Sequence, residues 1–263
     1  MLAPLAHLAM TRTLRLTLAY DGTDYHGWQV QPALPTVQGL LTDALSRILR
    51  EPVKVVGASR TDAGVHALGQ VASFVTTREI SLLAIRSGLN ALLPSDVRVL
   101  EVAEAPPGFD ARRSARLKRY AYLIDNGPVA LPLLRRYSWH VPKRLDPTAM
   151  RAALRALRGK HDFSAFCAAP GRERTPICTV FSSRLLARRS LLAVFVSADS
   201  FLHHMVRNIL GSLVEVGRGI HRPEWIAELL SGRDRTRAGP TAPPHGLTLL
   251  RVSYSLVRRS PAT

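Results

Sequence analysis

The order of hydrophobic periodicities between residues 14 and 102 constrains the fold more than any other feature. Apolar and polar residues alternate in some segments, as in half-buried strands, and recur at i, i+3 and i+4 in others, as in amphipathic helices. The predicted elements are strands at 14–20, 53–56, 68–75 and 97–102 and helices at 37–49 and 82–92. Strand, helix, strand, strand, helix, strand is a ferredoxin-like order. It predicts an α+β fold with a mainly antiparallel sheet and helices on one face.

Pro106, Pro107 and Gly108 interrupt any regular element, and we expect a domain boundary there. The predicted domains are residues 13–107 and residues 108–263. The second domain repeats the same kinds of element without a visible sequence repeat. Its predicted elements are strands at 120–124, 177–186, 191–197 and 247–254 and helices at 146–159, 201–217 and 223–230. A helix start at Asp146 is indicated by a capping residue followed by a first-turn proline.

The loop of residues 57–66 connects two predicted strands and carries Asp62, the only acidic residue between Glu51 and Glu79. Glycines at 57 and 64 allow backbone conformations or close approaches that a side chain would obstruct. A single carboxylate on a loop held by a sheet suits a nucleophile or general base. An aspartate that caps a turn through backbone amides is the alternative reading of the same spacing.

The formal charge of +17 arises from 36 Lys and Arg against 19 Asp and Glu. Such an excess favours a polyanionic partner, and nucleic acid is the leading candidate. The densest basic cluster, residues 111–119, leads directly into Tyr120 and Tyr122, which point to the same face if the segment is a strand. Basic residues next to aromatic ones suit phosphate contacts with base stacking, although a solvated basic face is the other interpretation.

The sequence lacks the residues that several other kinds of functional site require. Cys167 and Cys178 do not form a metal set or a disulfide framework, and the loop of residues 21–29 does not match a calcium-binding EF-hand. We expect no metal at His203 and His204, because adjacent residues on a helix point about 100° apart, and one of them is expected to pack or hydrogen-bond in the core. Nucleophile-elbow and P-loop glycines are also missing. A glycosidase would need a second carboxylate beside the first.

The apolar leader up to Thr11 lacks a basic start and a signal-peptide core, and no segment is long enough to span a membrane. We expect a cytoplasmic protein in a reducing compartment. Met10 is an alternative start to Met1. The tail of residues 258–263 is expected to be disordered.

Four motifs carry a resemblance to a known family. They are residues 60–67 (RTDAGVHA), 21–29 (DGTDYHGWQ), 118–122 (KRYAY) and 201–209 (FLHHMVRNI). In this order they resemble the TruA family of tRNA pseudouridine synthases, and they span roughly residues 13–253. Residues 117–118 and 163–167 depart from the family pattern, which puts substrate contacts in doubt more than chemistry.

The resemblance implies two ferredoxin-like or RRM-like halves joined around a central cleft, with helices on the outer face. It implies that Asp62 is the catalytic carboxylate, attacking the sugar or abstracting its proton, and that Tyr120 stacks on the flipped uracil and takes the proton from C5. Arg60 would help to extrude the target nucleotide, and Arg207 would pair with Asp62. A guanidinium beside a carboxylate favours its charged form.

The implied activity is conversion of uridine to pseudouridine at positions 38, 39 and 40 of the tRNA anticodon stem-loop. The resemblance implies no cofactor and a homodimer with tRNA lying across both subunits. Two other hypotheses remain: a non-catalytic RNA-binding protein, indicated by the charge and the basic strand, and a glycosidase that releases free uracil through Asp62.

Overall fold

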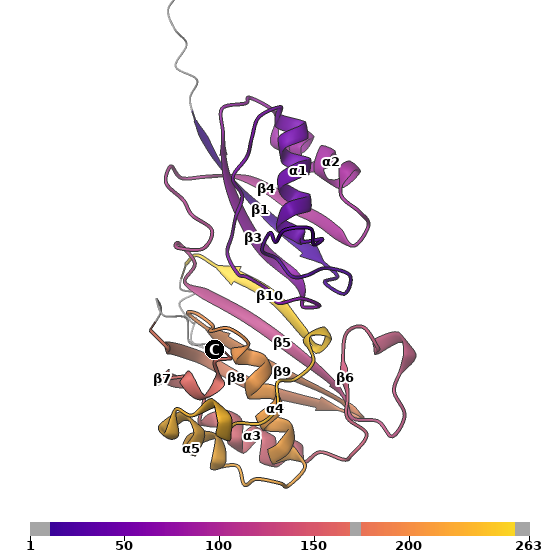
Figure 1. Ribbon diagram of the computed structural model, residues 1–263, viewed down its shortest axis with the longest axis vertical. Helices are drawn as coiled ribbons and strands as arrows, with labels where there is room; N and C mark the ends of the chain where they lie inside the picture. The colour runs from indigo at the N-terminus through magenta and orange to yellow at the C-terminus, as the bar shows by residue number, and fades with distance from the viewer. Residues whose placement is uncertain (1–10, 169–174, 256–263) are drawn as a thin grey trace, which may run out of the picture.

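Ten strands form one continuous sheet in the computed structural model, which describes residues 11–168 and 175–255 (Figure 1). Eight of the strands follow one another across the sheet, and two short strands pair at the sides of this path. In order across the sheet, the eight are β4 (Val97–Ala105), β1 (Arg12–Tyr20), β3 (His66–Thr76), β10 (Leu247–Ser253), β5 (Leu117–Asp125), β9 (Leu191–Ala198), β8 (Ile177–Arg188) and β7 (Gly159–Asp162). The short strands are β2 (Val56–Gly57), on β3, and β6 (Trp139–His140), on β5.

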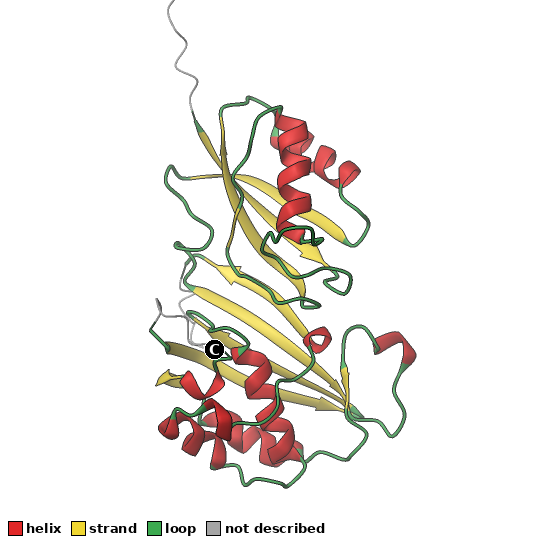
Figure 2. Cartoon of the chain, viewed as in Figure 1, coloured by secondary structure: helices red, strands yellow, loops and turns green. Residues whose placement is uncertain are grey.

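The helices fall into two groups, one at each end of the sheet (Figures 1 and 2). The first group is α1 (Val37–Leu49) and α2 (Leu82–Leu92), and the second is α3 (Pro147–Arg155), α4 (Met205–Gly217) and α5 (Trp225–Gly232). Short 3-10 helices are η1 (Pro132–Leu134), η2 (Ser164–Phe166), η3 (Arg235–Arg237) and η4 (Pro244–Gly246). Local sequence explains the starts of α1 and α3, because the side chains of Thr36 and Asp146 accept hydrogen bonds from backbone amides in the first turn.

The predicted α+β fold with mainly antiparallel pairing is confirmed. The two halves share a single sheet, because β10, the last strand of the chain, inserts between β3 and β5. It pairs parallel to β3 and antiparallel to β5, so both strands gain hydrogen-bonding partners along an edge that would otherwise be exposed. The division of the chain between residues 107 and 108 stays a prediction.

Burial alternates along the strands, which identifies the face of the sheet that is covered. On β1, Leu14, Leu16 and Leu18 are fully buried, while the residues between them are partly exposed. On β5, Tyr120, Tyr122 and Ile124 are buried in the same alternating way. One side of the sheet therefore holds the core, and the other side is more open.

The bounds of several elements differ from those predicted. The segment at 53–56 forms strand only from Val56, and α4 begins at Met205 although a helix was expected to begin near residue 201. The helix expected at 146–159 ends at Arg155. Hydrophobic periodicity does not fix these ends, since capping geometry decides where a helix begins and stops.

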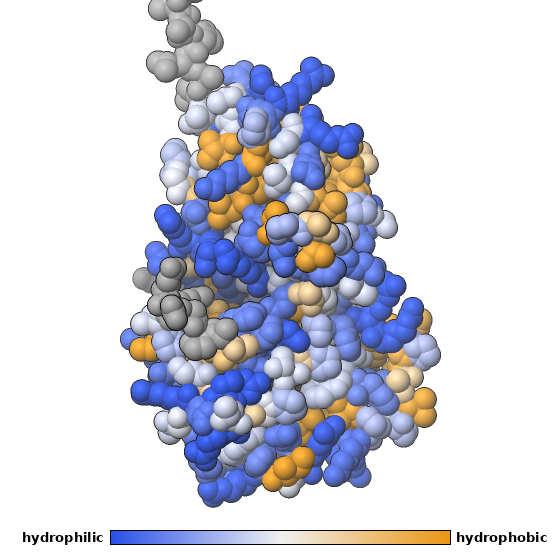
Figure 3. All heavy atoms as spheres, in the orientation of Figure 1, coloured by the Kyte–Doolittle hydropathy of each residue, from blue (hydrophilic) through white to orange (hydrophobic). Residues whose placement is uncertain are grey.

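Cys167 and Cys178 are both buried. Among the described residues, no helix has the length and apolar character needed to cross a membrane. The expectations about Met1, Met10 and the tail of residues 258–263 fall outside the described residues. The face seen in Figure 3 is hydrophilic over most of its area, with apolar patches among the charged side chains.

Candidate functional site

The loop that carries Asp62 is held by backbone hydrogen bonds to the loop that follows β1. Trp28 N donates to Thr61 O at 3.0 Å, and Gly64 N donates to Tyr25 O at 3.2 Å. Gly27 permits this approach, because its φ is 86° and a Cβ there would lie 2.6 Å from Thr61 O. The motifs at 21–29 and 60–67 are thus two parts of one structural unit.

The Asp62 carboxylate receives two contacts on the same oxygen. Arg207 Nη1 donates to Asp62 Oδ2 at 3.0 Å, and His204 Nε2 lies 3.5 Å from that oxygen. The Asp62 side chain is 21% exposed and the Arg207 side chain is 13% exposed, so the ion pair is largely shielded from solvent. Arg207 Nε also donates to Ala242 O at 2.8 Å, which fixes the guanidinium at a second point.

Tyr120 enters the site from β5 with its ring buried. Its hydroxyl lies 2.8 Å from Ser59 Oγ, and its ring meets the edge of Phe201 at a centroid distance of 5.0 Å. Burial raises the pKa of Tyr120, an effect that the hydrogen bond with Ser59 partly offsets. At neutral pH the phenol is therefore protonated.

A buried network of hydrogen bonds continues behind Ser59. Gln70 accepts from Ser59 N through Oε1 and donates to Ser59 O at 2.6 Å and to Tyr20 OH at 3.3 Å. Tyr20 OH in turn lies 2.8 Å from Thr61 Oγ1, and burial raises the pKa of Tyr20 to about 12. The loop on either side of Arg60 is therefore held through its side chains as well as its backbone.

These groups surround a cavity of about 420 Å³, large enough for a nucleotide base. All four residues singled out in the sequence contribute to its lining. The polar and charged residues of the lining are Gln29, Ser59, Arg60, Thr61, Asp62, Arg112, Lys118, Tyr120, His203, His204 and Arg207. Arg60 is exposed, so its guanidinium is available to solvent or to a ligand. The chain thus brings one carboxylate and several basic groups together at a concave surface.

Tyr122 shares the face of Tyr120, as predicted, but it does not reach the cavity. Its hydroxyl donates to Pro243 O at 2.8 Å, and the side chain is fully buried. The segment before η4 therefore covers Tyr122, which leaves Tyr120 as the tyrosine of this strand that lines the site.

The expectation for His203 and His204 is wrong in two respects. Both precede α4, where the helical spacing of 100° does not apply, and their rings lie 3.9 Å apart with an interplanar angle of 37°. Neither is buried in the core: His203 is exposed, and the His204 side chain is 26% exposed. The family motif at 201–209 contained both residues, but no periodicity indicated that they face Asp62.

Asp62, His203 and His204 are also the residues of the site with metal-binding chemistry. Their ligand atoms lie within 4.8 Å of one another. However, the Arg207 guanidinium is 3.0 Å from the same carboxylate, and a divalent cation there would meet strong repulsion. The charge around this cluster suits an anionic ligand better than a metal ion.

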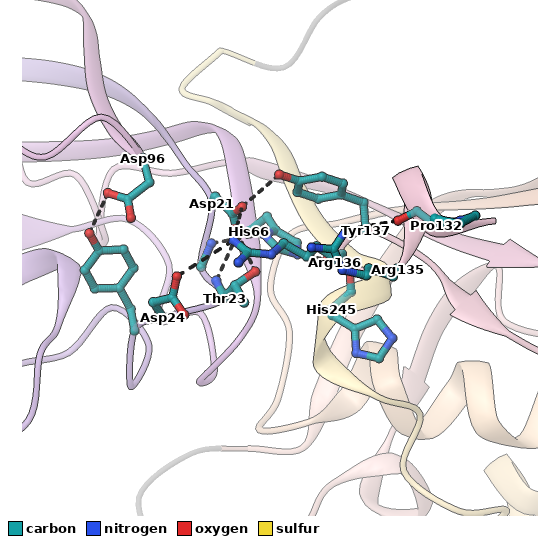
Figure 4. Close-up of polar contacts among 12 residues, drawn as sticks. Asp21, Thr23, Asp24, His66, Asp96, Pro132, Arg135, Arg136, Tyr137 and His245 are labelled. Atoms are coloured by element: carbon teal, nitrogen blue, oxygen red, sulfur yellow. Dashed lines mark hydrogen bonds and ion pairs between the residues drawn. The ribbon is translucent and has the colours of Figure 1, made fainter. Parts of the chain in front are cut away.

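A second polar cluster joins the loop after β1 to the segment before β6 (Figure 4). Tyr137 OH donates to Asp21 Oδ2 at 2.8 Å, and Arg136 lies 3.9 Å from the same carboxylate. His66 is buried, with Nδ1 3.0 Å from Gly22 N and Nε2 2.9 Å from Arg136 O. His66 thus ties the end of the Asp62 loop to both neighbouring segments. Sequence reasoning placed His66 in the motif without finding this role.

Comparison with known proteins gives one consistent result. A family model described as tRNA pseudouridine synthase matches residues 17–112 and 153–255. The chain is 46% identical over 243 residues to tRNA pseudouridine synthase A of Pelobacter propionicus, covering 92% of this chain and all of that protein. It is 47% identical over 242 residues to the protein of the same name from Myxococcus xanthus, covering 92% of this chain and 91% of that one.

A relative from Chloroflexus aurantiacus, also described as tRNA pseudouridine synthase A, is 48% identical over 247 residues, which cover 92% of this chain and 89% of the relative. Among solved structures, a chain of a Cbf5-Nop10-Gar1 complex matches with a TM-score of 0.36 and 11% identity, covering 90% of this chain and 48% of that one.

Proposed function

The chain belongs to the tRNA pseudouridine synthase family, and we propose that it converts uridine to pseudouridine at positions 38, 39 and 40 of the tRNA anticodon stem-loop. The observation that carries the proposal is the Asp62 carboxylate in a cavity whose other charged side chains are basic and whose lining includes the aromatic rings of Tyr120 and Phe201. The net charge of +17 supports a polyanionic substrate.

The reaction breaks the bond between uracil N1 and ribose C1′ and joins C5 to C1′. The proton leaves C5, and N1 gains one, so no oxidant or second substrate is consumed. Asp62 acts on the ribose, either by attack at C1′ or by removal of a ribose proton. Both routes need an anionic oxygen at the sugar, and the Arg207 contact at 3.0 Å supports that charged form.

Tyr120 stacks on the uracil after the nucleotide has left the helix. Its ring lines the cavity, and base extrusion from a stack costs a few kcal/mol that such stacking offsets. Burial raises the pKa of Tyr120, so its phenol starts protonated; it takes the C5 proton only as its own proton passes to Ser59 Oγ, 2.8 Å away, and Ser59 releases its hydroxyl proton in turn, which balances the proton that N1 gains. Arg60, exposed at the cavity, helps to hold the nucleotide out of the stack.

We also propose a cytoplasmic homodimer. Support for self-association comes from the open side of the sheet, where a hollow of about 860 Å³ is lined largely by apolar residues and Leu68 is 61% exposed. Sedimentation equilibrium measures the mass, and a monomer at micromolar concentration would contradict this part of the proposal.

We propose the division into domains at residues 13–107 and 108–263 because the proline-rich linker lies between them.

The activity is tested with unmodified tRNA transcripts and carbodiimide mapping of pseudouridine. Adducts that resist alkali are expected at positions 38, 39 and 40 where these are uridine, and a cytidine at one position removes that adduct alone. A non-catalytic RNA-binding protein would bind the transcripts without forming any adduct. Release of free uracil would instead identify a glycosidase.

A further inference from the structure

His204 has an unusual backbone conformation at the entrance to α4. Its φ is 58° and its ψ is 4°, in the left-handed region, where residues other than glycine are uncommon. Backbone strain of this kind persists where the surrounding structure requires it and is concentrated at functional sites. In this case it accompanies an imidazole that lies 3.5 Å from the Asp62 carboxylate.

Among the described residues, the two side chains that contact the Asp62 carboxylate both approach the same one of its two oxygens. Arg207 Nη1 and His204 Nε2 both approach Oδ2. Within residues 11–168 and 175–255, Oδ1 has no hydrogen-bond or ion-pair partner. Since Asp62 lines the cavity, a fixed Oδ2 determines the direction in which Oδ1 points.

The surroundings of His204 favour a neutral imidazole. Partial burial lowers the pKa of His204, and the neighbouring His203, Arg207 and Arg235 lower it further, while the Asp62 carboxylate acts in the opposite sense. A neutral ring with its proton on Nε2 can donate to Asp62 without placing a second full positive charge beside the carboxylate. The His203 ring lies beside the His204 ring, with 3.9 Å between the centroids and a tilt of 37°.

We propose that His204 is a positioning residue that holds Asp62 Oδ2 together with Arg207, so that Oδ1 is directed at the ribose of the bound uridine. This inference rests on the proposed function. The distance of 3.5 Å exceeds an ordinary hydrogen bond of about 2.9 Å. Contacts of this kind often tighten only when substrate is bound.

The backbone of His204 determines which substitutions test the proposal. Alanine would add backbone strain, whereas both asparagine and glycine accept a left-handed conformation. Asparagine carries its amide nitrogen at about the position of imidazole Nδ1, whereas glutamine carries it at about the position of Nε2, the atom that lies 3.5 Å from Asp62 Oδ2. Comparison of His204→Gln with His204→Asn and His204→Gly therefore separates the contact with Asp62 from the backbone effect.

We expect His204→Gly to lower kcat about tenfold or more, as for loss of one hydrogen bond to a charged group. The Kd for tRNA should change less than about twofold, while His204→Gln should keep kcat within about threefold of the original protein and His204→Asn should lose about as much as His204→Gly. Ala33→Gly is the matched control, because exposed Ala33 also has a positive φ, of 59°, and lies outside the cavity lining. We expect it to leave both constants unchanged.

Equal losses of kcat in the glutamine and glycine variants would overturn the proposal, as would weaker tRNA binding with unchanged kcat. If His204→Gly does not fold, His204→Asp replaces it, since aspartate accepts the same backbone but cannot donate when ionised. A folded His204→Asp protein with full kcat would also overturn the proposal. If the unsubstituted protein forms no pseudouridine, the proposed function fails first, which distinguishes the two failures.

Discussion

Arg207 Nη1 donates to Asp62 Oδ2 at 3.0 Å across 145 positions of sequence. The contact joins the first turn of α4 to the loop between β2 and β3, and the bond from Arg207 Nε to Ala242 O holds the guanidinium in place. The position of the Asp62 carboxylate thus depends on a side chain that is distant in sequence.

Substitution Arg207→Lys should lower kcat about 100-fold, because one ammonium cannot reproduce two hydrogen bonds in the planar arrangement of a guanidinium. Single-turnover formation of pseudouridine at saturating protein measures the effect. Arg158→Lys is the matched control, since Arg158 is likewise held at two points, by Ser183 Oγ and O, but lies outside the cavity lining. Equal rates for the two variants would contradict the role of the ion pair.

Substitution Ser59→Ala should lower kcat about tenfold, because the Tyr120 hydroxyl loses its partner at 2.8 Å. Stability should fall by about 1 kcal/mol, the usual net value of one buried hydrogen bond. Ser183→Ala removes a similarly buried hydroxyl, which donates to Leu154 O and accepts from Arg158 Nε, so it should cost at least as much stability with no loss of turnover. Urea unfolding and single-turnover rates on both variants distinguish the effect on Tyr120 from general destabilisation.

The Asp21 cluster should make stability depend on pH in the acid range. Burial raises the pKa of Asp21, but hydrogen bonds from Thr23 and Tyr137 and the nearby His66 outweigh it, so the pKa is lowered overall. A carboxyl with a lowered folded-state pKa binds fewer protons when folded than when unfolded. Its contribution is therefore fully present above the unfolded value of about 3.9 and is lost as the pH falls through the folded value.

The matching experiment compares Asp21→Asn with the unsubstituted protein by urea unfolding from about pH 7 to about pH 2. The two free energies of unfolding should differ by a constant amount above about pH 5 and converge as the pH falls below about 4. A difference that stays constant through the acid range would show that the Asp21 charge contributes nothing to stability.

Basic residues at the cavity should contribute to tRNA binding through phosphate contacts. Arg112→Ala should weaken binding severalfold and reduce the slope of log K against log salt by about 1. Arg86→Ala, on the exposed side of α2 and outside the cavity lining, is the charge-matched control and should leave the slope unchanged. Filter binding at several salt concentrations gives both slopes, and equal slopes for the two variants would exclude Arg112 from the RNA contact.

Local patterns predicted the parts of the fold that local interactions decide. The helical periodicity of α1 and the alternation along β1 were both predicted, and each matches the structure. The insertion of β10 between β3 and β5 was not predicted, because strand order depends on hydrogen bonding between segments distant in sequence.

The candidate site also has features that the sequence predicted and features that it did not. The motif of residues 60–67 drew attention to Asp62, and resemblance led to Arg207, whose ion pair with Asp62 is present. His204 was missed because it was read as helical, whereas its positive φ places it before the helix. The contacts of Ser59 and Gln70 were not predicted either, since a buried hydrogen-bond network produces no periodic pattern in the sequence. The chemical roles of Asp62, Tyr120, Arg60 and Arg207 stay predictions.

The most direct measurement is tritium release from tRNA that carries 5-tritiated uridine, with Asp62→Asn compared with the unsubstituted protein at equal bound tRNA. Asparagine keeps the shape of the side chain but removes the anionic oxygen. We predict release by the unsubstituted protein and none by Asp62→Asn, with the Kd for tRNA unchanged within about threefold, since the carboxylate is not needed for phosphate binding. Tritium release by Asp62→Asn at the original rate would contradict the account.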